Sequence, residues 1–242
     1  SHTDGSWFFN PDSPIFQGIR LTHQPSPWIG DYSWLLIAPV SEKILHSDIY
    51  HRQSSYRPDE SIFQPHYLKI NSNRYQISTE LTPSRYGARF RLTNQRGQPI
   101  SLILHSEAKM VFQQVDANTL LGSLKEETKP AKQSLVMHVC LRFDQPIKKQ
   151  SFLDQDLVLD FEQSQLQFSL ATSFISEEQA LINLPQSSFD ELKEETKRDW
   201  EYFLHRFDIV DQGKIDRRMF DQALYRLFLF PQTFYEDRKS VV

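Results

Sequence analysis

The sequence contains one cysteine, few glycines and no long apolar run. Cys140 is the only thiol among 242 residues, so no disulfide can form within the chain. It lies in an apolar stretch, residues 135–141, which indicates a buried structural thiol rather than a nucleophile. No apolar stretch is long enough to span a membrane. Only 7 glycines accompany 18 phenylalanines, a balance that favours a β-rich fold with large side chains between packed sheets.

The chain also lacks a large excess of either charge. Its net charge is −4 with both signs mixed, so there is no electrostatic reason to expect nucleic acid or a membrane as a partner. An apolar content of 39% is typical of a globular chain, and the length allows one large or two small domains. The single cysteine is compatible with both the cytoplasm and secretion, and we favour the cytoplasm slightly.

Familiar catalytic motifs are absent from the sequence. It has no Gly-rich phosphate loop, no cysteine pair for zinc and no metalloprotease helix signature. The histidines are scattered, and none stands at metal-ligand spacing with another ligand. Carboxylates are plentiful, but a sequence does not show which two would face each other across the roughly 6.5–9.5 Å that an inverting glycosidase needs.

Short strands separated by turns are predicted from residue 7 to about residue 184. Their steady spacing, with hardly a helix among them, predicts a large antiparallel β-sandwich or a barrel. Two hairpins are expected, one turning at residues 71–73 and one within residues 161–168. The main predicted strands are residues 17–22, 34–38, 67–70, 75–81, 88–93, 98–105, 110–115, 119–123, 135–143, 156–161 and 166–173.

Two helices are predicted after the strands. Ser187 or Ser188 caps the first, residues 189–207, and Glu191 stands where a capping box with Ser188 requires it. The second helix is predicted at about residues 216–230. The apolar residues expected on the inner faces are Phe189, Leu192, Trp200, Phe203, Leu204 and Phe207 in the first helix, and Phe220, Leu224, Leu227 and Phe228 in the second.

A stiff loop at residues 20–32 is the strongest functional signal. Pro25 and Pro27 fix their own φ angles and push the preceding residues towards extended geometry. The loop presents the aromatic ring of Trp28 beside several hydrogen-bonding side chains. A sugar has an apolar face and hydroxyl groups, so it is a suitable ligand for such a surface.

Three stretches resemble glycoside hydrolase family 92. Residues 18–32, Gly-Ile-Arg-Leu-Thr-His-Gln-Pro-Ser-Pro-Trp-Ile-Gly-Asp-Tyr, look like the N-terminal signature of that family. Residues 78–90 resemble the strand pair that follows it. Residues 195–200 and 220–226 resemble the family's linker helix and the first helix of its catalytic domain. The likeness covers nearly the whole chain in order; it departs at Ser33 and Trp34, where a glycine and a smaller residue are expected, which concerns the local loop shape.

The resemblance implies a function and an architecture. Members of the family are calcium-dependent exo-α-mannosidases that invert configuration, and we expect an α-1,2-mannosidase. Residues 1–185 would form an N-terminal β-sandwich, residues 186–210 a helical linker, and residues 211–242 the start of an (α/α)-barrel catalytic domain. The general acid, the general base and the calcium ligands would lie in the missing part of that barrel, so the fragment alone would be inactive.

The resemblance also implies which residues bind substrate. The family's N-terminal domain lends a loop to the sugar pocket, which maps onto Trp28, with His23, Gln24 and Asp31 as companions. The expected partners are therefore α-mannoside glycans and the protein's own catalytic domain.

Each of these residues also has a purely structural interpretation. Trp28 could close the core, and Asp31 could hold the turn at Gly30 through a hydrogen bond. We expect Arg20 to pair with a carboxylate or cap backbone carbonyls. Two further arginines, Arg85 and Arg89, are expected to be structural or to lie at a domain interface.

Two other functions stay open at this point. The chain could be a stand-alone carbohydrate-binding sandwich, or a structural module whose aromatic surface docks another chain. It begins at Ser1 without a methionine and ends soon after an aromatic helix. Because such a helix would be a poor end for a self-contained domain, we expect the natural protein to continue.

Overall fold

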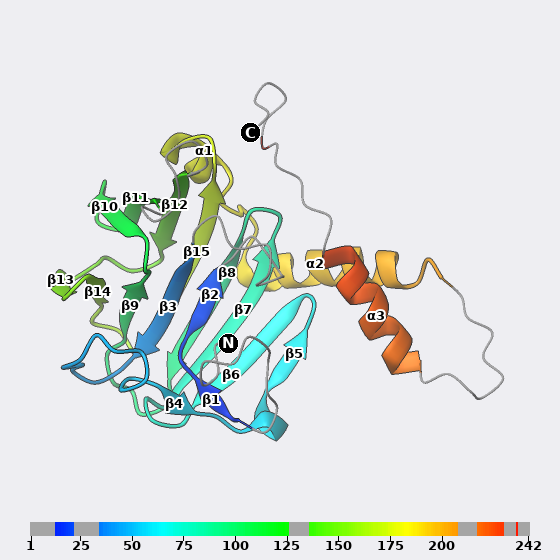
Figure 1. Cartoon of the computed structure of the whole chain (residues 1–242), viewed down its shortest axis with the longest axis horizontal. Coiled ribbons are helices and arrows are strands. Elements are labelled where there is room, and N and C mark those ends of the chain that lie inside the picture. Colours follow the sequence, from blue (N-terminus) through cyan, green and yellow to red (C-terminus); the bar gives the residue numbers. More distant parts are fainter. Residues whose placement is uncertain (1–12, 22–33, 126–135, 208–216, 230–235, 237–242) are drawn as a thin grey trace.

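Two antiparallel sheets stacked face to face make up most of the molecule, and helices follow at the C-terminal end (Figure 1). The computed structural model describes residues 13–21, 34–125, 136–207, 217–229 and 236. The larger sheet has eight strands and the smaller has five, and a two-stranded ribbon joins β1 to β4. The sandwich predicted from strand spacing is therefore confirmed.

Strands are the commonest regular elements among the described residues. In chain order they are β1 (Ile15–Phe16), β2 (Ile19–Leu21), β3 (Leu35–Val40), β4 (Ser54–Ser55), β5 (Ile62–Gln64), β6 (Tyr67–Ser72), β7 (Ile77–Ser84), β8 (Gly87–Asn94), β9 (Ser101–His105), β10 (Lys109–Gln114), β11 (Thr119–Lys125), β12 (Val136–Phe143), β13 (Lys149–Leu153), β14 (Asp156–Asp160) and β15 (Gln165–Ser173). The eight-stranded sheet has the order β10-β11-β12-β15-β8-β7-β6-β5, and the five-stranded sheet has the order β13-β14-β9-β3-β2.

The prediction of a hairpin within residues 161–168 is wrong. Strand β14 belongs to the five-stranded sheet and β15 to the eight-stranded sheet, so the chain crosses between the layers here. The hairpin partner of β14 is β13, paired from Lys149↔Asp160 to Leu153↔Asp156. This strand was not predicted, because it lies at a sheet edge and carries no continuous apolar face.

The hairpin between β6 and β7 is confirmed, but its turn lies a few residues later than expected. The strands pair from Leu68↔Leu81 to Ser72↔Ile77, so residues 73–76 form the connection. Gln76 adopts a positive φ of 53°, and Tyr75 belongs to the turn instead of the strand. A left-handed residue at this point gives the two strands the twist they need.

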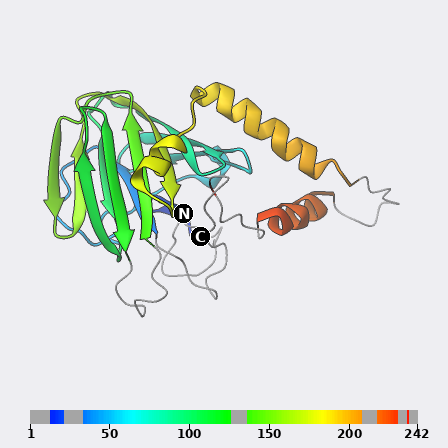
Figure 2. The same ribbon diagram turned by 90° about the horizontal axis from the view of Figure 1, so that it is seen from above.

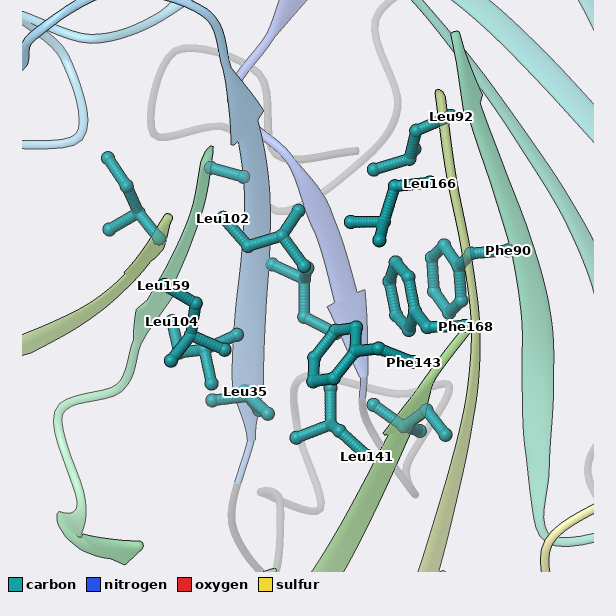
Figure 3. Packing of buried hydrophobic residues seen from close by; sticks show 14 of the residues in the cluster. Leu35, Phe90, Leu92, Leu102, Leu104, Leu141, Phe143, Leu159, Leu166 and Phe168 are labelled. Atoms are coloured by element: carbon teal, nitrogen blue, oxygen red, sulfur yellow. The ribbon is translucent and has the colours of Figure 1, made fainter. Parts of the chain in front are cut away.

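The core fills the space between the two sheets, where large apolar side chains from both layers meet (Figure 3). Strand β8 shows the alternation clearly: Ala88, Phe90 and Leu92 are buried while the residues between them are not. Phe90 pairs in register with Phe168 of β15, and their rings stack with centroids 4.4 Å apart. Phenylalanine rings thus pack between the two sheets, as the composition indicated.

A short helix, α1 (Glu177–Ile182), covers the outer face of the eight-stranded sheet. It was not predicted, because six residues are too few to show a helical period. Ala180 packs there against Cys140 and Ala171 of the sheet. Cys140 is fully buried, and burial raises the pKa of its thiol to about 11, so the prediction of a buried structural thiol is confirmed.

Helix α2 (Phe189–Leu204) begins as predicted and projects away from the sandwich (Figure 2). Ser188 is its N-cap: the hydroxyl accepts from the Glu191 amide, and the Glu191 carboxylate accepts from the Ser188 amide. The predicted capping box is therefore confirmed. The helix ends at Leu204, earlier than the predicted residue 207.

Helix α3 (Arg217–Leu229) lies beside the distal half of α2. The ring of Trp200 meets Tyr225 at 5.1 Å, and Phe203 meets Phe228 at 5.4 Å. Leu227, which was expected to face inward, is 62% exposed, so that prediction is wrong for the residues present. None of the described helices is long and apolar enough to cross a membrane.

One residue near the C-terminus contacts the sandwich again. Glu236 accepts hydrogen bonds from the Phe174 amide and from the Asn183 side chain, both at 2.7 Å. These two donors flank α1, so the carboxylate ties this part of the chain to the junction between the sheet and the helices.

Candidate functional site

The four predicted sugar-binding residues lie outside the described residues. Trp28, His23, Gln24 and Asp31 all fall within residues 22–33, whose two ends the structure does describe. Strand β2 leads into this segment and β3 leads out of it, and the two strands pair with Leu21 opposite Leu35. The segment therefore starts and finishes at adjacent positions on one side of the five-stranded sheet.

Gly18 allows β2 to lie this close to β3. It adopts a φ of 142°, and a Cβ atom at this position would come within 2.6 Å of the Ile37 carbonyl oxygen. Any other residue would meet that backbone, and a positive φ is costly for a side chain. The first residue of the family-like stretch thus has a structural explanation.

Arg20 and Trp34 contact each other across the base of residues 22–33. The guanidinium carbon of Arg20 lies 4.3 Å from the centre of the Trp34 indole. A cation held over an indole ring at this distance is an attractive contact. The expected partners of Arg20 were a carboxylate or backbone carbonyls, so the indole is a partner that sequence reasoning missed.

A row of polar contacts leads from Trp34 into the protein. The Trp34 and His105 rings lie 5.6 Å apart, and His105 Nδ1 is 2.6 Å from Asp156 Oδ1. The second oxygen of Asp156 accepts a hydrogen bond from Arg52 Nη1. We call Arg20, Trp34, His105, Asp156 and Arg52 the anchoring row.

The inner end of the anchoring row is a buried ion pair. Asp156 is 0% exposed and Arg52 is 2% exposed. The backbone carbonyl of Arg52 accepts from the Tyr75 hydroxyl at 2.6 Å, and burial raises the pKa of Tyr75 to about 12, so this phenol stays a donor at neutral pH. Removing one member of such a pair leaves a buried charge uncompensated, which is strongly unfavourable.

The backbone of Trp34 is held as well as its ring. The Ser106 hydroxyl donates to the Trp34 carbonyl at 2.6 Å and accepts from the Ala108 amide at 3.1 Å. Ser106 itself is buried. Both the indole and the main chain at the end of residues 22–33 are therefore fixed by β9 and the turn that follows it.

A metal site is not found in the described part of the chain. No group of three or more His, Cys, Asp or Glu side chains there is arranged to hold an ion. Where His and Asp side chains meet there, they bind each other: His105 binds Asp156, which also binds Arg52, and His51 binds Asp48. The described residues therefore do not fit a calcium ion, whose ligands the resemblance places in the missing part of the barrel.

The arginine that joins the sheet to α2 is Arg91, which the sequence analysis did not single out. Its guanidinium bonds Asp190 at 2.7 Å and lies over the Phe189 ring at 4.2 Å. Of the two arginines expected in such a role, Arg85 stacks over Tyr86, and Arg89 lies on β8 two residues before Arg91. Period-2 spacing from Arg89 could have identified Arg91 as a neighbour on the same face.

A groove lies between the sheet edge and the two distal helices. Its volume is about 590 Å³. Its lining combines the apolar and aromatic residues Phe63, Pro65, Leu68, Leu204 and Tyr225 with four polar or charged ones, Gln64, Asp221, Gln222 and Arg226. Nearby, Tyr202, Phe203 and Phe207 are also substantially exposed. This end of the molecule therefore presents an apolar surface of the kind that another folded region covers.

Several solved structures share this fold. An inverting mannosidase of family GH92 from Bacteroides thetaiotaomicron superimposes with a TM-score of 0.84 at 22% identity, covering 98% of this chain and 36% of the other. An α-mannosidase of the same family and organism gives a TM-score of 0.65 at 14% identity, covering 80% and 31%. The GH92 family glycosyl hydrolase ccman5 gives a TM-score of 0.67 at 18% identity, covering 80% of this chain and 32% of the other. This chain thus spans about a third of the length of these proteins.

Comparison with sequence families gives two matches in succession. No curated protein sequence matches the chain. The glycosyl hydrolase family 92 N-terminal domain matches residues 1–184, and the glycosyl hydrolase family 92 catalytic domain matches residues 174–241. The first match alone covers most of the chain and coincides with the two-sheet sandwich; the second begins where β15 ends and includes α1, α2 and α3. The chain belongs to glycoside hydrolase family 92, and it comprises the N-terminal domain with a short first part of the catalytic domain.

Proposed function

We propose that this chain is the N-terminal part of a calcium-dependent, inverting exo-α-mannosidase that prefers α-1,2 linkages. The observation that carries the proposal is the succession of the family's N-terminal and catalytic domains within one chain. The mannosidases with the same fold support the substrate class. The proposed division is a sandwich at residues 1–185, a linker at 186–210 and the start of an (α/α)-barrel at 211–242.

In this proposal residues 22–33 complete the sugar pocket from the sandwich side. The indole of Trp28 would cover the apolar face of a mannose ring, because it offers a large rigid surface at small entropic cost. His23, Gln24 and Asp31 would bind hydroxyl groups. Polar groups left unpaired by a wrong sugar give stronger discrimination than an apolar pocket alone.

The remaining pocket would come from the rest of the catalytic domain. The groove beside α2 and α3 supports this, since it lies between the sandwich and the part of the chain that matches that domain. The catalytic acid, the catalytic base and the calcium ligands are proposed to lie beyond residue 242. This chain alone would therefore not hydrolyse α-mannosides, and it would hold only one side of the pocket that binds them.

The test compares the 242-residue chain with the chain extended to the natural end of its reading frame. Release of mannose from an α-1,2-linked mannobiose is measured with calcium and with a chelator. We expect activity only in the extended chain and only with calcium. An extended chain that is inert on every mannoside tried would overturn the proposal.

A second candidate, a stand-alone carbohydrate-binding sandwich, is separated by one further measurement. Binding of mannobiose to the 242-residue chain is measured by calorimetry, with Trp28→Ala as the comparison. Binding that is lost in Trp28→Ala while the extended chain stays inert would favour the stand-alone module.

A further inference from the structure

We infer that the outer face of the five-stranded sheet carries a second carbohydrate-binding site, a groove that takes a neutral sugar chain. Every described residue that lines the groove lies between residues 40 and 162, within the match to the N-terminal domain. This lining is therefore separate from the four residues proposed for the sugar pocket. The choice of a neutral sugar follows from the groove, and the choice of mannose as that sugar rests on the proposed function.

The groove consists of two hollows that run into each other. The larger has a volume of about 550 Å³, within the range of small-molecule sites. Strands β9, β13 and β14 line it, as do residues 41–44, which follow β3. The smaller hollow, of about 480 Å³, shares Pro99, Ser101, Lys149 and Asp160 with the larger one. Because they share these residues, the two form one continuous groove, a shape that suits a chain of sugars.

A polar row crosses the groove at one level of the sheet. Ser101 of β9 pairs with Asp160 of β14, and Asp160 pairs with Lys149 of β13. Residues paired in register share a face of the sheet. Their neighbours Leu102 and Leu159 lie in the core between the sheets, so the polar row faces outward (Figure 3). None of the three polar residues is buried.

Apolar side chains line the groove beside the polar row. Val158 lies two residues before Asp160 on the same face of β14, and it remains partly exposed, as do Ile44 and Leu153. Phe152, also part of the lining, is 75% exposed and offers an aromatic ring. A pyranose ring has an apolar face and an edge of hydroxyl groups, so adjacent apolar and polar surfaces match both.

The polar row offers both hydrogen-bond acceptors and donors. Asp160 Oδ1 accepts from the Ser101 hydroxyl at 2.7 Å, and the described residues provide no hydrogen bond to Oδ2. The ammonium group of Lys149, on the neighbouring strand, forms no ion pair with a described residue. Sugar hydroxyls both donate and accept, so an available carboxylate oxygen beside an available ammonium can bind adjacent hydroxyls.

The charges along the groove favour a neutral ligand. The larger hollow is lined by two carboxylates and two ammonium groups, those of Glu42, Asp160, Lys43 and Lys149. The smaller hollow adds Lys148 and Glu162, which pair with each other at 2.9 Å. The described lining therefore has no net charge, so a phosphate or another anion gains no net attraction from it. A neutral ligand rich in hydroxyl groups fits this lining better.

The groove is preformed, because the chain beside it is held at two points. Arg74 Nε donates to the Glu42 carboxylate at 2.7 Å. Further along, the Ser47 hydroxyl donates at 2.5 Å to Asp154, in the turn between β13 and β14. A site whose surroundings are already fixed loses little conformational entropy when a ligand binds.

The first experiment titrates the ¹⁵N-labelled 242-residue chain with two neutral disaccharides, α-1,2-linked mannobiose and maltose, and follows the backbone amide resonances. For mannobiose we expect a dissociation constant of about 1–10 mM. The shifts should concentrate in residues 41–44, 99–103, 149–153 and 158–162. Inorganic phosphate at the same concentrations should not cause them.

The second experiment repeats the titration with variants of the polar row. Asp160→Ala should weaken binding by about tenfold or more, because the sugar hydroxyls lose a charged acceptor. Lys149→Ala should act in the same direction; this residue is exposed on an edge strand, so it decides the question if Asp160→Ala does not fold. Asp116→Ala is the matched control, since that carboxylate also accepts a hydrogen bond, from the Asn118 amide, but lies in a turn of the other sheet.

The outcomes separate this inference from the proposed function. Groove shifts that weaken in Asp160→Ala or Lys149→Ala support the second site, and an extended chain that is inert on all mannosides then overturns only the proposed function. Binding of maltose alone supports the site and removes mannose as its ligand. The inference is overturned if neither disaccharide shifts these residues, if phosphate binds there more tightly, or if Asp116→Ala weakens binding as much as the row variants.

Discussion

The two halves of α2 differ in the fate of their apolar side chains. At the start, Phe189 is 1% exposed and Leu192 is 7% exposed, because both pack on the eight-stranded sheet. Near the end, Phe203 is 41% exposed and Tyr202 is 59% exposed. The apolar side of one continuous helix is therefore buried in its first half and largely exposed in its second half.

The difference shows that helical periodicity identifies a face but not its partner. Phe189 and Phe203 belong to the same predicted apolar side of the helix. Phe189 contacts the Tyr67 ring, whose centre lies 6.5 Å away, and the Arg91 guanidinium. Among the described residues, Phe203 contacts the ring of Phe228 in α3 and that of the exposed Tyr202 beside it. In the proposed full-length protein, the rest of the catalytic domain would cover it.

The largest expected effect is the loss of Phe189. Phe189→Ala should lower the free energy of unfolding of the 242-residue chain by about 3–5 kcal/mol, since a buried ring is replaced by a cavity. Phe203→Ala should cost less than about 1 kcal/mol in the same chain, because a half-exposed ring leaves no sealed cavity. Urea denaturation of both variants measures the two values.

The same pair of variants sharpens the comparison in the extended chain. If the catalytic domain covers the distal half of α2, Phe203→Ala should cost clearly more there than in the 242-residue chain. Equal losses for the two variants in the short chain would show that the distinction between the two halves is wrong.

A smaller effect is expected from the N-cap. Ser188→Ala should lower the free energy of unfolding by about 1 kcal/mol, because the Glu191 amide loses its acceptor. Ser187→Ala is the matched control, since that hydroxyl contacts the exposed Glu195 side chain and does not cap the helix. A Ser187 variant as unstable as the Ser188 variant would contradict the capping role.

The smallest effect is expected on the pH dependence of stability, through His66, whose pKa is influenced by two lysines of α2. Burial lowers the pKa of His66 below its ordinary value of 6.5, and the positive charges of Lys193 and Lys197 lower it further. Below about pH 6.5 the unfolded chain then binds more protons than the folded chain, so stability present above that pH is lost as the pH falls. Melting curves between about pH 5 and 8 should show a weaker dependence in His66→Gln. An unchanged slope would mean that His66 does not contribute.

Local sequence rules predicted much of the fold. The capping box at Ser188 was found because its two partners lie three residues apart. Most strands were found from their apolar alternation. The edge strand β13 and the short α1 were missed because neither carries enough local periodicity. The crossing between β14 and β15 was missed because it depends on which layer each strand joins, and neither length nor periodicity encodes that choice.

The candidate site was also predicted only in part. Two prolines and an aromatic ring indicated a stiff, ligand-facing stretch, and its resemblance to family 92 led to the family that the domain matches confirm. The anchoring row could not be predicted, because Asp156 stands 51 residues from His105 and 104 residues from Arg52. Only the pairing of β2, β3, β9 and β14 brings these side chains to one level.

The sequence by itself determined the strand-rich composition, the helix start at Ser188 and the membership of a glycoside hydrolase family. Each depends on residues close together in the chain, where backbone preferences and side-chain periodicity act directly. The tertiary structure decided which apolar faces are covered, where the chain crosses between sheets and which carboxylate stands behind Trp34. These depend on contacts between distant segments, which acquire their energy only when the two sheets have closed on a common core.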